Sequence, residues 1–80
     1  MAHYTFGHTS RGFSLIEFED SNKQECSIQK SSIAMEDLVW IGAGSIRMHI
    51  KQDQAKAIAE ILLYFAEMGE LPESMEALQS

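Results

Sequence analysis

The chain has 80 residues, 45% of them hydrophobic, which suits one small domain with a single core. Its formal net charge of −6 argues against direct binding to DNA or RNA, because such proteins need basic residues to neutralise phosphates. The single cysteine excludes an intramolecular disulfide, and no apolar run approaches the roughly 20 residues that cross a bilayer.

The absence of repeats and low-complexity tracts predicts a single domain over residues 1–80. A lone cysteine fits a reducing compartment. The N-terminus lacks a basic stretch followed by an apolar core, so we expect no signal peptide and a cytoplasmic location.

The N-terminal half is expected to form strands. Residues 1–10 suggest an edge strand or an arm, because Tyr4 and Phe6 alternate with polar neighbours. Residues 12–19 and 24–30 are rich in β-favouring side chains and flank a turn at 20–23. They therefore predict an antiparallel hairpin.

Within this hairpin, Cys26 and Ile28 are expected to face the core, because they alternate with polar residues. Two further strands are expected at 38–42 and 46–50, since Ile46, Met48 and Ile50 also alternate with polar residues.

The segment Gly42-Ala43-Gly44 resembles the start of a dinucleotide-binding loop. That motif requires a third glycine where Arg47 stands, and a helix directly after the loop. We therefore interpret the glycines as a reversal between two strands. Trp40, in the strand before them, is assigned to the core rather than to a binding hot spot.

Residues 52–68 predict a helix, because they lack Gly and Pro and are rich in Ala, Leu, Ile and Glu. Gly69 is the expected C-terminal stop. The tail, 70–80, is expected to be either a short helix or a frayed end. The fold class is thus α+β, an antiparallel sheet of about four strands with one long helix packed on one face.

This helix has an apolar arc wider than one sheet face requires. Its central stripe comprises Ala55, Ile58, Ala59, Leu62, Phe65 and Ala66. An exposed apolar face often marks an interface, so the arc predicts a homodimer or a protein partner. The flanking residues of that contact would be Ile61, Tyr64 and Met68. The alternative is that loops and the tail cover this surface.

No residue pattern indicates catalysis, a metal or a cofactor. The histidines and Cys26 lack metal-ligand spacing. A nucleophilic pair of Cys26 with His8 or His49 is disfavoured, because a thiol on the apolar face of a strand is usually inert. We therefore expect a protein that is not an enzyme.

The acidic balance instead suits contact with a basic surface on another protein. The plainer alternative is that acidity only maintains solubility. The candidate partner-binding residues are Glu17, Glu19, Asp20, Glu36 and Asp37 on the sheet side, and Glu60, Glu67 and Glu70 on the helix side.

One sequence pattern extends over about residues 11–71. It reads R-G-F-x-L-x-E-F-x-D, then C-S-x-Q-x-S-S, E-D-x-x-W-x-G and R-M-H, and ends with G-E-L after the helix. It resembles a family of small proteins encoded by phages and prophages of proteobacteria. Through one short member, the resemblance implies an anti-CRISPR role against a type I system, with type I-C as the expected subtype.

The chain departs from longer members of that family in two places. They carry an insertion between W-x-G and R-M-H, where this chain has only 43–46, so a function of the insertion would be absent. They also often place Thr where this chain has Lys51, which removes a favoured N-cap.

The resemblance and the charge together lead to one expected function. It is a phage-encoded, non-enzymatic inhibitor in the bacterial cytoplasm, whose acidic surface mimics DNA. It would bind a type I CRISPR surveillance complex and block target-DNA binding. The alternative is a small dimeric phage accessory or regulatory protein that binds another host or phage protein.

Overall fold

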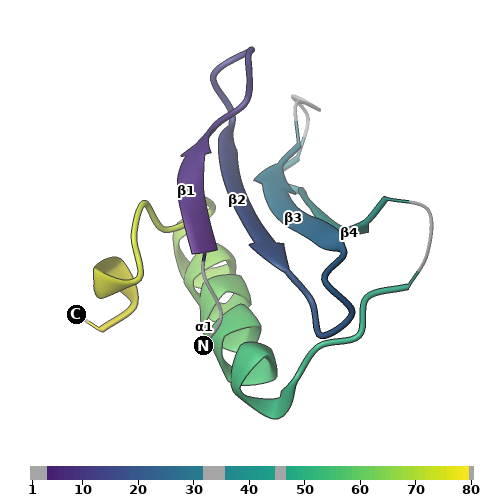
Figure 1. The fold of residues 1–80 in the computed structure, drawn as a ribbon. Helices are drawn as coiled ribbons and strands as arrows, with labels where there is room; N and C mark the ends of the chain where they lie inside the picture. The colour runs from purple at the N-terminus through teal and green to yellow at the C-terminus, as the bar shows by residue number, and fades with distance from the viewer. Residues whose placement is uncertain (1–3, 32–35, 45–46, 80) are drawn as a thin grey trace.

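A four-stranded antiparallel sheet and one long helix make up the fold (Figure 1). The computed structural model describes residues 4–31, 36–44 and 47–79. Its elements are β1 (Tyr4–His8), β2 (Ser14–Glu19), β3 (Glu25–Lys30), β4 (Val39–Ala43), α1 (Gln52–Met68) and the 3-10 helix η1 (Glu76–Gln79). The expected α+β class and the helix at 52–68 are confirmed.

The strands follow one another across the sheet in sequence order, β1-β2-β3-β4. The expected hairpin is the β2–β3 pair, in which Ile16 lies opposite Ile28 and Phe18 opposite Cys26. Its turn contains Lys23 with a φ of 60°.

Two predictions about the later strands are wrong. Residues 47–50, the described part of the expected strand 46–50, are not in a strand, and β1 is the fourth strand instead. Gly42 and Ala43 do not reverse the chain, because both belong to β4 and pair with β3. The segment 47–50 lacks a neighbouring strand and is held by the β2–β3 turn, where Ser21 N donates to His49 O over 2.7 Å.

The core lies between α1 and one face of the sheet, which we call the inner face. Its buried residues are Ile16, Phe18, Cys26, Ile28, Ile58, Ile61 and Leu71. Because residues opposite each other in an antiparallel pair share a face, the register carries this apolar surface across the sheet, from Phe6 through Ile16 and Ile28 to Ile41. The tail contributes to the core through the buried Leu71 and the half-buried Leu78.

A backbone N–H group at each end of α1 makes a local hydrogen bond. At its start, Lys51 N donates to Gln54 Oε1 over 3.0 Å. At its end, Gly69 adopts the left-handed conformation (φ 73°) and its N–H donates to Phe65 O over 2.8 Å. Among the described residues, no helix combines the length and hydropathy needed to traverse a bilayer.

Only part of the central apolar stripe of α1 packs against the sheet. The buried side of the helix runs along Gln54, Ile58 and Ile61, with Phe65 partly buried. The exposed alanines are Ala55, Ala59 and Ala66. The exposed part of the apolar arc therefore consists of these alanines together with Leu63 and Met68.

Candidate functional site

The second face of the sheet, which we call the outer face, is the side away from α1 (Figure 1). The strand register places its side chains in three rows. The rows are Gly7, Leu15, Gln29 and Trp40; then Thr5, Glu17, Ser27 and Gly42; then Glu19 and Glu25. This face is therefore apolar toward one end and acidic toward the other.

The acidic end consists of Glu17, Glu19 and Glu25, which we call the acidic face. All three residues are exposed, and Glu19 lies directly opposite Glu25 in the β2–β3 pair. Like charges directly opposite each other destabilise a sheet. The acidic face therefore lowers the stability of the hairpin that carries it, so structural stability does not explain its presence.

The apolar end of the outer face carries Trp40, whose predicted place in the core is wrong. Trp40 is 60% exposed. It lies in β4 opposite Gln29, while its neighbours Val39 and Ile41 take the inner face. A large exposed aromatic residue on a sheet face that no described element covers is typical of a binding surface.

Asp20 does not belong to an accessible acidic surface, because it is 5% exposed. Its Oδ2 accepts the N–H of His49 over 2.8 Å, and its Oδ1 accepts the N–H groups of Asn22 and Gln24 over 2.9 and 3.0 Å. These hydrogen bonds, with that from His49 the largest cause, lower the pKa of Asp20 below its usual value. Asp20 thus fixes the segment before α1 to the β2–β3 turn and has a structural role.

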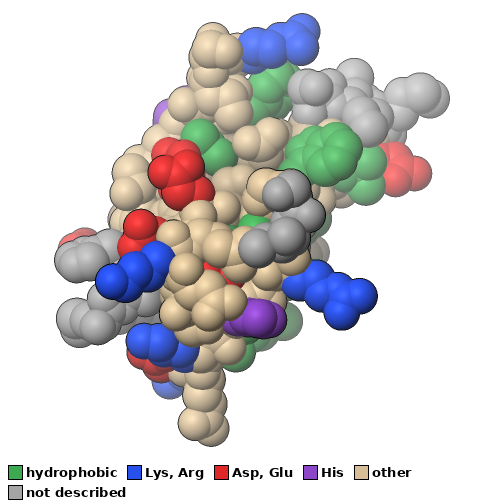
Figure 2. Space-filling model, turned by 45° about the vertical axis from the view of Figure 1, so that its right-hand side comes forward, with side chains coloured by type: hydrophobic (Ala, Val, Ile, Leu, Met, Phe, Trp, Pro, Cys, Tyr) green, Lys and Arg blue, Asp and Glu red, His purple; other side chains and the backbone are tan. Residues whose placement is uncertain are grey.

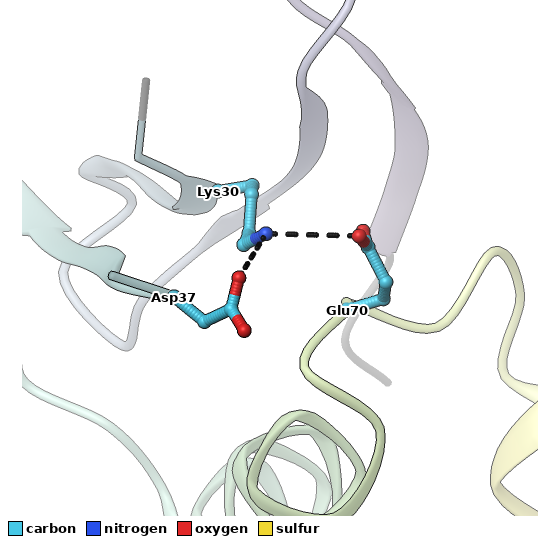
Figure 3. A network of polar contacts seen from close by, with 3 residues as sticks. All are labelled: Lys30, Asp37 and Glu70. Atoms are coloured by element: carbon cyan, nitrogen blue, oxygen red, sulfur yellow. Dashed lines mark hydrogen bonds and ion pairs between the residues drawn. The ribbon is translucent and has the colours of Figure 1, made fainter. Parts of the chain in front are cut away.

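Two further acidic candidates, Asp37 and Glu70, form ion pairs with a basic residue of the same chain. Lys30 Nζ lies 3.2 Å from Asp37 Oδ1 and 3.6 Å from Glu70 Oε1 (Figure 3). Lys30 is at the end of β3, Asp37 precedes β4, and Glu70 follows α1. Both carboxylates therefore pair internally and connect the helix end to the sheet.

The remaining acidic candidates lie elsewhere. Glu36 and Glu67 are exposed, and Glu60 is half-buried on α1. On the side of the molecule seen in Figure 2, acidic side chains alternate with basic, polar and hydrophobic ones. The structure does not gather the eight predicted residues into one surface, and of these only Glu17 and Glu19 belong to the acidic face.

The three residues predicted to flank a self-association site differ in how far they are exposed to solvent. Ile61 is fully buried, at 0% exposure, and is part of the core. Tyr64 is half-buried and Met68 is 61% exposed. Ile61 is therefore unavailable to a partner.

Glu25 was missed by the sequence reasoning, although a signal for it was present. The predicted hairpin with a turn at 20–23 brings the start of the second strand beside the end of the first. Glu25 also shares the polar face with Ser27 and Gln29. In the predicted hairpin, Glu25 therefore lies on the same face as Glu17 and Glu19.

An open groove of about 510 Å³ borders the acidic face. Besides the three glutamates, its charged lining comprises Asp20, Lys23, Lys51 and Asp53. Within the described residues, no group of three or more His, Cys, Asp or Glu side chains is arranged to hold a metal ion.

Neither of the two described histidines forms a nucleophilic pair with Cys26. Burial raises the pKa of the Cys26 thiol, which keeps it protonated and weakly nucleophilic. Tyr4 lies opposite Phe18, the strand neighbour of Cys26, whereas His8 is at the other end of β1, about 13 Å further along the strand. The ring of His49 contacts the side chain of Asn22 instead.

Comparisons of the chain with models of protein families, with curated proteins and with solved structures gave no match.

Proposed function

We propose that the chain is a non-enzymatic binding protein whose acidic face engages a basic surface on a protein partner. The observation that carries this proposal is the like-charge pair Glu19–Glu25, which is exposed, uncovered by any described element and unfavourable for the fold. Glu17 adds a third negative charge on the same face.

A basic partner would convert this repulsion into attraction. Among the described residues, the ion pairs are those of Lys30, so none of the described cations lies within ion-pair distance of the acidic face. Facing charges of opposite sign speed the encounter of two proteins and fix their orientation. The acidic face is therefore suited to a partner with clustered Lys and Arg.

The sequence resemblance directs the choice of partner. A type I CRISPR surveillance complex holds target DNA on basic residues, and an acidic protein that occupies those residues would block DNA binding. Inhibition would then be stoichiometric and would consume no substrate. We propose this activity for the chain, with the acidic face as the DNA mimic.

The test is target-DNA binding by a purified type I surveillance complex, type I-C first, with increasing amounts of the protein. We expect DNA binding to be lost near a stoichiometric ratio. The test variant combines Glu17→Gln, Glu19→Gln and Glu25→Gln, and it should inhibit at least tenfold more weakly.

A matched control separates the acidic face from net charge. It combines Glu36→Gln, Glu67→Gln and Glu73→Gln, three exposed positions outside the acidic face. Both variants change the net charge from −6 to −3, because each loses three carboxylates. Full DNA binding at excess wild-type protein would exclude the surveillance complex as the partner. Equal loss of inhibition in both variants would exclude the acidic face as the contact.

A further inference from the structure

Among the described residues, the outer edge of β4 has backbone groups without a hydrogen-bond partner. β4 is the last strand of the sheet, with β3 on one side only (Figure 1). Ser31 N donates to Leu38 O over 2.8 Å, which continues the β3–β4 ladder by one hydrogen-bonded pair. Hydrogen-bonded pairs alternate along an antiparallel ladder, so Trp40 and Gly42 also bond to β3.

The same alternation determines where the backbone N–H and C=O groups of the other three residues of β4 point. Val39, Ile41 and Ala43 direct their N–H and C=O groups away from β3, toward the open edge. These three residues could accept another strand without breaking any hydrogen bond of the sheet.

The edge lacks the usual protection against such pairing. Proteins commonly protect edge strands with charged residues or proline, and β4 has neither. Leu38, Trp40 and Ile41 are 37%, 60% and 41% exposed. Exposed apolar side chains thus flank the unpaired backbone on both faces of the sheet, with Trp40 on the outer face and Ile41 on the inner face.

We propose that β4 pairs antiparallel with β4 of a second copy of the chain, about a two-fold axis at Ile41. The sequence of β4 is Val39-Trp40-Ile41-Gly42-Ala43, and the two-fold axis at its central residue makes each pairing on either side of that residue occur twice. Val39 lies opposite Ala43 of the second copy, Ile41 opposite Ile41, and Trp40 opposite Gly42. The outward-directed groups then form about six interchain hydrogen bonds, two for each bonded pair.

The pairing of Trp40 with Gly42 gives the register its specificity. A Cβ placed on Gly42 would have no atom within 4 Å, so the space above this glycine is open on the outer face. The indole of Trp40 from the second copy fills that space, and the symmetry repeats the contact. Aromatic residues across from glycine in neighbouring strands stabilise sheets in this way. On the inner face, the two Ile41 side chains meet and are covered.

Charge also favours this edge as the contact between two copies. Each copy has a net charge of −6, so surfaces bearing carboxylates repel one another. The acidic face lies on β2 and β3, and β4 itself carries no charge. The dimer does not depend on the proposed inhibitor function, and it would leave both acidic faces exposed on the same side of an eight-stranded sheet.

Sedimentation and fluorescence test the dimer directly. We expect the wild-type protein to pass from monomer to dimer as its concentration rises. Trp40, the single tryptophan of the chain, should shift its emission to shorter wavelength over the same range, because dimerisation covers it. Ile41→Lys should raise the dimer dissociation constant at least tenfold, while Thr5→Lys on the opposite edge strand should not change it.

Cysteine cross-linking tests the register in a variant that keeps a small apolar side chain. Ile41→Cys should form a disulfide-linked dimer under mild oxidation, because Cα atoms of a hydrogen-bonded pair are about 5.5 Å apart, within disulfide reach. Thr5→Cys on β1 and Leu63→Cys on α1 should remain monomeric on a denaturing gel. A wild-type monomer at all concentrations would overturn the proposal. Cross-linking through position 5 or 63 and not through 41 would also overturn it.

Discussion

Reversal of one charge in the acidic face should stabilise the protein and weaken its function at the same time. Glu25→Lys places a cation directly opposite Glu19 in the β2–β3 pair. Two exposed unit charges about 6 Å apart repel by about 0.7 kcal/mol in water, and screening at physiological ionic strength reduces this to about 0.3 kcal/mol. The variant replaces this repulsion with attraction of similar size.

The expected gain in the free energy of unfolding is therefore about 0.7 kcal/mol, within the range of cross-strand pairs. For a domain of this size, the gain corresponds to a rise in Tm of about 3–6 °C. Thermal unfolding followed by circular dichroism measures it. In the DNA-binding assay with the surveillance complex, the same variant should inhibit less than the wild-type protein.

The electrostatic origin of the gain has two controls. In 1 M salt, where the Debye length is about 3 Å, the gain should fall to about 0.2 kcal/mol. Glu73→Lys makes the same change in net charge at an exposed position outside the sheet. If the gain persisted in 1 M salt, or if Glu73→Lys matched it, repulsion between Glu19 and Glu25 would not be its cause.

Three further variants test the contacts that support this surface. Gly69→Ala should destabilise the protein by about 1 kcal/mol in urea unfolding, because its φ is 73° and the new Cβ would lie 3.1 Å from Asp37 Oδ2; unchanged stability would show that the cap relaxes without cost. Asp20→Asn should lower the urea midpoint at pH 7 but much less at pH 3. The hydrogen bond from His49 lowers the pKa of Asp20 in the folded state. The ionised Asp20 therefore stabilises the protein above its unfolded-state pKa, and this stabilisation is lost as the pH falls through its folded-state pKa. An equal midpoint difference at both pH values would contradict this assignment. Ile61→Val should cost about 0.5–1.5 kcal/mol without changing the dimer dissociation constant, since Ile61 is fully buried; a weaker dimer would return it to the interface.

Local patterns in the sequence were sufficient for the hairpin and the helix. Alternation around Cys26 and Ile28 identified their inward direction, because one face of that strand is polar. Gly69 identified the helix end, because its left-handed conformation suits glycine. In these elements, local preference and tertiary packing agree.

The direction of the side chains in β4 could not be predicted in the same way. Leu38–Ile41 is apolar throughout, so period-two alternation cannot show which of its side chains face the core. Trp40 is exposed because the register with β3 places it opposite Gln29. The register between strands depends on the whole sheet, so the sequence of β4 alone does not indicate it.

The segment 47–50 shows the opposite limitation. Its alternating pattern is typical of a strand, but a strand also needs an edge to pair with. The segment instead binds the β2–β3 turn through Asp20, a residue 29 positions before His49. No pattern within the segment indicates that contact. Two acidic candidates were placed elsewhere for the same reason, since Asp20 and Glu70 have partners distant in sequence, His49 and Lys30.

The sequential order of the strands has a consequence for the rate and course of folding. Each strand pairs with its neighbour in the chain, so only short loops must close before the sheet exists, and such topologies fold fast. Contacts between residues far apart in the sequence form later: Gln54 Nε2 donates to Glu19 O across 35 positions, and this hydrogen bond requires α1. During synthesis from the N-terminus, the sheet can therefore be complete before the helix exists. Docking of α1 is then the step that removes the apolar inner face from water and protects the nascent chain from aggregation.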